Sequence, residues 1–279
     1  MKKSYKKKKK MLRTLLAALC ILFLVLVLFS AWKIWSIING YKAAERRYDS
    51  LAGSVVATAV PASTDSGAQS GEAALPAGND EETDGAQPRE LSPVEVDFDA
   101  LRGISGDVIG WICLPHTPIN YPVVQGRDNV FYLDHFLDGN KSAGGSLFAD
   151  YLCPSDFSGH NTIIYGHNMR DGSMFALVDD YKEQSFYEEH PVMYLNTPSQ
   201  NYRLDIVSAF TADPEGFVYT TSFPSDEDYA AFLRTLTAAS EISCSAEAGV
   251  DDRIVTLSTC TYTDEDVRFV LCAKLSEIG

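Results

Sequence analysis

Two stretches near the C-terminus decide the fold of this 279-residue chain: Arg253–Cys260, which reads RIVTLSTC, and Val267–Leu275, which reads VRFVLCAKL. Both are rich in β-branched and apolar residues, and this composition predicts two strands. Because side chains of a strand point alternately to its two faces, Val255 and Leu257 would share one face and Cys260 would lie on the other, beside hydroxyl groups. Cys260 is therefore expected to end a strand on its polar face, which makes it a candidate nucleophile.

Arg268 lies in the second strand, on the face opposite to Phe269. An arginine within a strand is costly to bury unless it meets an anion. A solvated face or a structural salt bridge would account for it, as would a role beside the thiol. A tight hairpin between the two strands would bring Arg268 next to Cys260.

The rest of the domain, from about residue 95 onward, alternates short apolar segments with Gly, Pro, Asn and Asp. The composition of these segments predicts further strands at 119–124, 146–149, 162–165 and 202–210, and helices at 96–102, 129–133, 174–181 and 226–240. Because strands dominate and helices decorate them, a mainly β fold is expected, an antiparallel barrel or sandwich in preference to a doubly wound sheet.

A thiol nucleophile needs a base, and His167 is the best placed of the five histidines. It follows an apolar strand through Gly166 in the run TIIYGHN, and a strand end on a turn that glycine permits is a common place for a working side chain. The other histidines adjoin prolines or lie in polar stretches and are expected in turns or on the surface: His116, His135, His160 and His190.

The cysteine pattern argues against a disulfide framework and against a zinc site. Five cysteines follow the apolar N-terminal run, at 113, 153, 244, 260 and 272, with no CxxC pair. Metal sites and disulfide scaffolds use closer, paired spacings. The odd number leaves at least one free thiol, and we expect neither a metal nor a cofactor.

The N-terminal third has a different composition from the rest. A basic tail at 1–13 precedes an apolar anchor at 14–38, of which Thr14 to Trp32 contains no charged residue and would span roughly 28 Å as a helix. A cleaved signal peptide is the rival interpretation. Residues 39–94 are expected to form a juxtamembrane helix and a flexible acidic stalk, and 95–279 the catalytic domain.

Charge supports this organisation. The lysines before the apolar run predict a cytoplasmic N-terminus and a catalytic domain outside the cell membrane. The net charge of the chain is −15, and the basic tail makes the remainder more acidic still. An acidic body repels polyanions, which argues against nucleic acid as a partner.

Taken together, TLSTC, YGHNM and the downstream RFV resemble the sortases, the cysteine transpeptidases of Gram-positive surfaces. Similarity to class B extends to INYPVVQGRDNVFYL at 119–133, GGSLFADY at 144–151 and the long helix before the cysteine strand. One departure is Thr261, at a position where some class B members carry an acid. The resemblance covers nearly all of residues 95–279.

The resemblance implies a closed eight-stranded β-barrel with peripheral helices and with His167, Cys260 and Arg268 converging at one end. It further implies a substrate groove that includes Asn129, Leu133 and Ser258. The implied reaction cleaves a sorting signal, Asn-Pro-x-Thr or a related Pro-x-Thr, after Thr and transfers the surface protein to an amine of a peptidoglycan precursor.

Other functions stay open at this point: a pilin-polymerising sortase, a cysteine endopeptidase that mainly hydrolyses, and a non-enzymatic surface adhesin. A papain-like peptidase would place its cysteine before its histidine in the chain, and here the order is reversed.

Overall fold

The computed structural model describes residues 2–58, 90–260 and 267–278 of the chain. It contains two compact units, residues 1–47 and 48–279. Helix α1 (Lys2–Val55) makes up the described part of the first unit and its last turns belong to the second. Among the described residues, one helical stretch, Leu19–Val55, is long and apolar enough to span a membrane. A single N-terminal apolar helix of this kind fits a membrane anchor.

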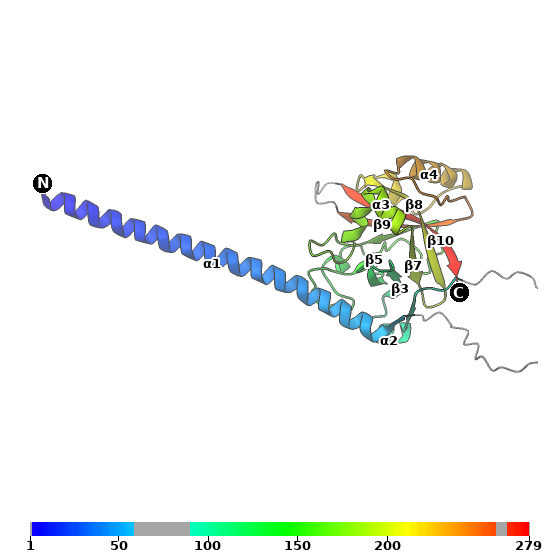
Figure 1. Cartoon of the computed structure of the whole chain (residues 1–279), viewed down its shortest axis with the longest axis horizontal. Coiled ribbons are helices and arrows are strands. Elements are labelled where there is room, and N and C mark those ends of the chain that lie inside the picture. Colours follow the sequence, from blue (N-terminus) through cyan, green and yellow to red (C-terminus); the bar gives the residue numbers. More distant parts are fainter. Residues whose placement is uncertain (1, 59–89, 261–266, 279) are drawn as a thin grey trace, which may run out of the picture. The chain divides into compact units, whose positions relative to one another are not determined.

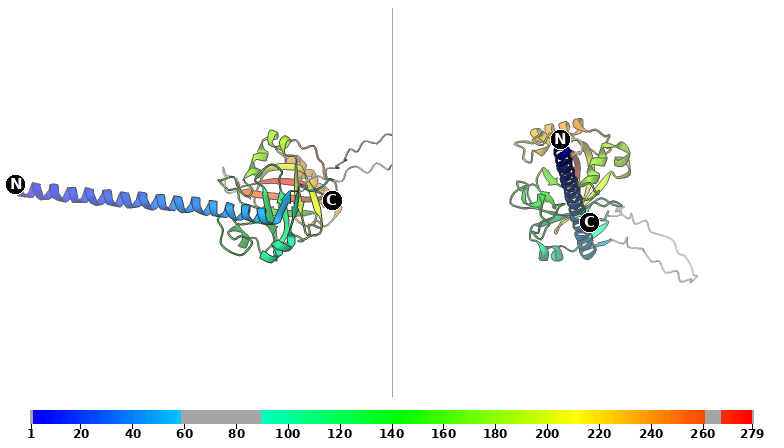
Figure 2. Two further views of the ribbon diagram at one scale, coloured as in Figure 1. Left: turned by 60° about the horizontal axis from the view of Figure 1, so that its bottom comes forward. Right: turned by 90° about the vertical axis from the view of Figure 1, so that its left-hand side faces the viewer.

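The second unit is built around a closed barrel of eight strands in the order β10-β8-β7-β3-β4-β5-β6-β9 (Figures 1 and 2). Neighbours pair antiparallel except β4 with β5 and β6 with β9, which are parallel. The strands are β3 (Val108–Cys113), β4 (Asn120–Val124), β5 (Leu147–Ala149), β6 (Asn161–Tyr165), β7 (Val192–Asn196), β8 (Asn201–Ala212), β9 (Arg253–Cys260) and β10 (Arg268–Ile278). The expected closed eight-stranded barrel is confirmed.

Helix α4 (Asp226–Ala239) covers the outside of the barrel near β8 (Figure 1). The Ser225 side chain accepts a hydrogen bond from the backbone N–H of Asp228, and three acidic residues in the first turn favour the helix N-terminus. Its apolar face buries Tyr229 and Phe232 against residues of β8, β9 and β10. The smaller helices are α2 (Phe98–Ile104), α3 (Gln184–Glu189) and the 3₁₀ turns η1 (Phe131–Leu133), η2 (Ala176–Lys182) and η3 (Phe217–Tyr219).

Three expected helices differ from the observed ones for local reasons. The first begins at Phe98, not residue 96, because the Asp97 side chain caps the N–H of Ala100 and Val94–Val96 forms strand β2. The segment 129–133 is reduced to the short turn η1. The segment 174–181 starts later, at Ala176, since Met174 has a φ of 57°, which a right-handed helix cannot accommodate.

The alternation expected along β9 is present, but its polar face is not open to solvent. Thr256 and Ser258 are buried, as are the apolar residues between them. The two hydroxyl groups are satisfied within the fold: Thr256 Oγ1 donates to Asn161 Oδ1 at 2.8 Å, and Ser258 Oγ lies 2.8 Å from Tyr219 Oη. Only Cys260, at the end of the strand, is exposed among residues 254–260.

Part of the predicted stalk is structured. Helix α1 continues to Val55, and strand β1 (Val56–Thr58) pairs antiparallel with β2 (Val94–Val96). Leu51 and Val55 are 7% and 6% exposed. Residues 48–58 therefore belong to the compact second unit, whereas the stalk residues 59–89 lie outside the described ranges.

Burial of Leu51 predicts a measurable contribution to stability. We expect Leu51→Ala to lower the free energy of unfolding of a chain that contains residues 48–279 by about 2–3 kcal/mol, because it removes a buried side chain and leaves a cavity. Leu91→Ala is the matched control, since Leu91 is 60% exposed, and it should change stability by less than about 0.5 kcal/mol. Urea unfolding measures both; equal small effects would return residues 48–55 to the stalk.

Candidate active site

Pairing of β9 with β10 places Cys260 directly opposite Arg268. The two residues are, respectively, the last of β9 and the first of β10, so both side chains lie at one end of the barrel. Cys260 is exposed and Arg268 is partly buried, and Arg268 Nη1 donates to the carbonyl of Val267 at 3.1 Å. The hairpin expected from the sequence therefore brings the thiol and the guanidinium side by side. Residues 261–266 of the connection, Thr261 among them, lie outside the described ranges.

The other neighbour of β9 brings His167 to the same end. Strand β6 runs parallel to β9 with Tyr165 opposite Ser258, and the N–H of Gly166 donates to the carbonyl of Ser258 at 3.1 Å. Any side chain at position 166 would collide with its surroundings, because a Cβ there would lie 2.4 Å from Leu147 and 2.5 Å from Phe175. The glycine before His167 is therefore required by close packing.

The imidazole of His167 is oriented by a backbone carbonyl. Nε2 of His167 lies 2.7 Å from the carbonyl oxygen of Leu133. Because a carbonyl can only accept a hydrogen bond, the hydrogen-bonded Nε2 carries the proton. This leaves Nδ1 as the ring nitrogen that can exchange a proton with a reacting group. Next to it, Asn168 Nδ2 donates to the carbonyl of Cys260 at 3.0 Å and joins the two loops.

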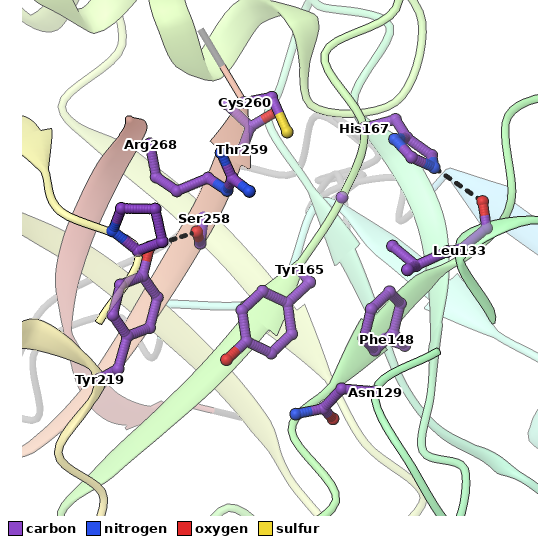
Figure 3. Close-up of a pocket in the computed structure, with 12 residues that line it drawn as sticks. Asn129, Leu133, Phe148, Tyr165, His167, Tyr219, Ser258, Thr259, Cys260 and Arg268 are labelled. Carbon is purple, nitrogen blue, oxygen red and sulfur yellow. Dashed lines mark hydrogen bonds between the residues drawn. The ribbon is translucent and has the colours of Figure 1, made fainter. Parts of the chain in front are cut away.

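All six residues singled out from the sequence line one cavity of about 300 Å³. In Figure 3, Cys260 and Arg268 lie on one side of this cavity and His167 and Leu133 on the other, with Tyr165 between them. The full lining is Asn129, Leu133, Phe148, Tyr165, Gly166, His167, Pro214, Tyr219, Ser258, Thr259, Cys260 and Arg268. The cavity is therefore built from loop ends and strand ends that lie far apart in the sequence.

Two tyrosines and an aspartate of the cavity wall were missed by sequence reasoning. Asp150 is buried and accepts hydrogen bonds from Asn129 Nδ2 at 2.8 Å and from Tyr165 Oη at 3.0 Å. Tyr219 stacks on Tyr165 with ring centroids 6.3 Å apart. Tyr165 and Asp150 stood within the quoted motifs, so position beside His167 and a buried acid were available signals. Tyr219 carried no motif, because only tertiary packing brings η3 to β9.

Burial determines the protonation of these groups. Desolvation raises the pKa of Tyr165, and the nearby Asp150 carboxylate raises it further. Desolvation also raises the pKa of Tyr219, although the positive charge of Arg268 acts in the opposite direction. Both phenols therefore stay protonated at neutral pH and offer neutral hydroxyl groups to the cavity.

The remaining thiols of the second unit differ from Cys260 in exposure. Burial raises the pKa of Cys113 and of Cys272 to about 12, and that of the half-buried Cys244 to about 11. Burial also raises the pKa of Cys153. Within the described ranges no cluster of three or more His, Cys, Asp or Glu side chains could hold a metal ion.

Comparisons with known proteins agree with this geometry. The family model described as a sortase domain matches residues 112–276. The chain belongs to the sortase family. It is 36% identical over 188 residues to sortase B of Staphylococcus aureus, which covers 67% of this chain and 77% of the relative. It is 35% identical over 178 residues to sortase B of Listeria monocytogenes, which covers 63% of this chain and 72% of the relative.

Solved sortase structures share the fold. The S. aureus sortase B–substrate complex superposes with a TM-score of 0.62 at 36% identity, over 65% of this chain and 85% of that one. Sortase B of Bacillus anthracis in complex with AAEK1 gives 0.61 at 36% identity, over 68% of this chain and 89% of that one. Sortases are cysteine transpeptidases, and the similarity is to class B; the barrel is the sortase B barrel.

Exposure predicts which thiol of this sortase reacts. At neutral pH iodoacetamide should modify Cys260 well before Cys113, Cys153, Cys244 and Cys272, because those thiols are more buried and their raised pKa values leave less thiolate. Peptide mass mapping of the folded, full-length chain separates all six cysteines, including Cys20 of α1. Equal or faster labelling of Cys272 in the folded protein would contradict this site.

Proposed function

We propose that this sortase is anchored in the cell membrane by α1, acts outside the cytoplasm, and joins surface proteins to the cell wall. Its reaction would cleave a C-terminal sorting signal after Thr and transfer the new carboxyl end to an amine. The observation that carries the proposal is the convergence of Cys260, His167 and Arg268 on one cavity, built by the two strand pairings of β9.

The first half of the reaction makes a thioester. Cys260 Sγ, as thiolate, attacks the carbonyl carbon of the Thr residue, and the carbonyl oxygen becomes an oxyanion. Arg268 lies beside the thiol and stabilises this negative charge with its fixed positive charge and its planar set of donors. His167 gives a proton to the departing amine as the C–N bond breaks. The acyl group stays on Cys260.

The second half reverses these roles. An incoming amine attacks the thioester carbonyl, His167 accepts the proton that the amine loses, and the C–S bond breaks to regenerate the Cys260 thiolate. The product carries a new amide bond. The Leu133 carbonyl holds Nε2 of His167, so Nδ1 serves in both proton transfers.

The substrate would be a Pro-x-Thr type of signal, with Asn-Pro-x-Thr favoured by the similarity to class B. Asn129, Leu133 and Ser258 line the cavity, and we assign them to binding of the signal. Similar structures include S. aureus sortase B with a substrate and with triglycine. An amine of a peptidoglycan precursor is the acceptor that fits the class B resemblance.

The orientation in the membrane rests on charge. Lys2, Lys3 and Lys6–Lys10 precede the apolar part of α1, and such residues stay on the cytoplasmic side. The catalytic unit, which follows the span, would then lie outside the cell, as a sortase acting on surface proteins requires. No partner in this scheme is a nucleic acid.

Product analysis separates transfer from hydrolysis. The full-length chain, incubated with a fluorescent peptide that contains Asn-Pro-x-Thr, should give mainly the amide adduct when an oligoglycine or a diamino-acid amine is present, and the free Thr carboxylate slowly when it is absent. Mass spectrometry identifies both products. Cys260→Ala should form neither. Free acid as the main product in saturating amine would favour an endopeptidase, and chain-to-chain pilin conjugates with a Lys-containing pilin peptide would favour a polymerase.

Arg268 separates oxyanion stabilisation from thiol activation. We expect Arg268→Lys to reduce peptide turnover by about 10²- to 10³-fold, because lysine keeps the charge but loses the planar fork. Iodoacetamide labelling of Cys260 should stay within about tenfold of the parent rate, since alkylation builds no oxyanion. Turnover near the parent rate would make Arg268 a structural residue, and equal loss of both rates would make it a modulator of thiolate formation.

A further inference from the structure

We propose that Tyr48, near the end of α1, is a positioning residue for His167 and acts through the backbone of Gly145–Ser146 and the carbonyl of Leu133. The inference rests on the proposed role of His167 as the acid and base of the reaction. It assigns a function to residues that the sequence placed in a stalk outside the catalytic domain.

Tyr48 is locked into the second unit by both its hydroxyl and its ring. The side chain is 4% exposed. Its hydroxyl donates to the carbonyl of Gly145 at 2.6 Å and lies 3.1 Å from Ser146 Oγ. The ring packs edge-on against Phe136 and Tyr121, with centroid distances of 4.8 and 5.1 Å. Tyr48 thus holds one side of the segment 145–146.

The other side of that segment lies against residues 132–133, backbone to backbone. The N–H of Ser146 donates to the carbonyl of Tyr132 at 2.9 Å. Gly145 has a φ of 57°, and a Cβ there would meet the carbonyl oxygens of Tyr132 and Leu133 at 2.5 Å. No flexible side chain intervenes between the two backbones. Movement of Gly145 is therefore transmitted to the carbonyl of Leu133.

That carbonyl is the hydrogen-bond acceptor of His167 Nε2, at 2.7 Å. The bond holds the proton on Nε2, and with it the tautomer that presents Nδ1 to the reacting groups. The same principle applies to metal-bound histidines, in which a second hydrogen-bond partner fixes the ring. The path therefore runs from the Tyr48 hydroxyl through Gly145–Ser146 and Leu133 to the imidazole.

The test compares Tyr48→Phe with Tyr181→Phe in the full-length chain in detergent. Tyr181 is a matched control because its buried hydroxyl also donates to a backbone carbonyl, that of His190, at 2.8 Å, and it lies outside the cavity. Both variants lose one buried hydrogen bond and should show similar small decreases in Tm. A purely structural role for Tyr48 would give the two variants the same catalytic behaviour.

The decisive readout is the nitrogen NMR spectrum of the histidine rings, with His167 assigned from its absence in His167→Ala. We expect the parent and Tyr181→Phe to show His167 as the Nε2–H tautomer, and Tyr48→Phe to show a mixture with the Nδ1–H tautomer. The kcat for peptide transfer should fall roughly 3- to 10-fold in Tyr48→Phe, less than the 10²-fold that a large misplacement costs.

The outcomes distinguish this inference from the function on which it rests. An unchanged His167 spectrum in Tyr48→Phe overturns the inference, whether or not turnover falls. Parent-like turnover in His167→Ala would instead overturn the proposed role of His167, while the spectrum of Tyr48→Phe still reports on the positioning path. Should Tyr48→Phe fail to fold, Ser146→Ala, which removes the Oγ beside Tyr48, should shift the tautomer in the same direction.

Discussion

Strand β9 is paired on both sides, antiparallel to β10 and parallel to β6, and the site depends on this double pairing. One register sets Arg268 opposite Cys260. The other sets Tyr165 opposite Ser258, so that His167 emerges at the same end of the barrel. A slip of one residue would turn Cys260 to the opposite face of the sheet and separate it from both partners. Because both neighbours are hydrogen-bonded along their length, neither register can shift alone.

Buried polar groups make that arrangement specific. Thr256 of β9 donates to Asn161 of β6, and the Asn161 amide in turn donates to the carbonyls of Val218 and Thr220 at 2.8 and 3.0 Å. These bonds hold η3, and with it Tyr219, against Ser258 of the cavity wall. A buried polar group without its partner is destabilising by about 1–3 kcal/mol, so alternative registers that break this network are disfavoured.

The sequence predicted the parts of the site that depend on local pattern. Alternation and a short connection were enough to place Arg268 beside Cys260, and the glycine before His167 was a sound signal for a strand end. Strands β3 and β7 were missed, because β3 carries a glycine in its middle and β7 is a short segment next to a proline. Residues 51–58 were misassigned to the stalk, since a few apolar residues in an Ala-rich stretch do not reveal that β1 pairs with a distant strand. Tyr219 and the carbonyl of Leu133 reach the site through tertiary contacts that no local pattern encodes.

The cavity differs in charge from the protein that surrounds it. The chain has a net charge of −15, yet no carboxylate is among the described residues that line the cavity, where Arg268 carries the permanent charge. Asp150 lies behind the wall, with its Oδ2 engaged by Asn129 and Tyr165, and the two tyrosines stay neutral because burial raises their pKa values. A peptide bond is neutral when it binds and gains negative charge only as the thiolate adds to it. A positive group in a cavity that is otherwise neutral therefore stabilises the transition state more than the bound peptide, and that difference is what accelerates a reaction.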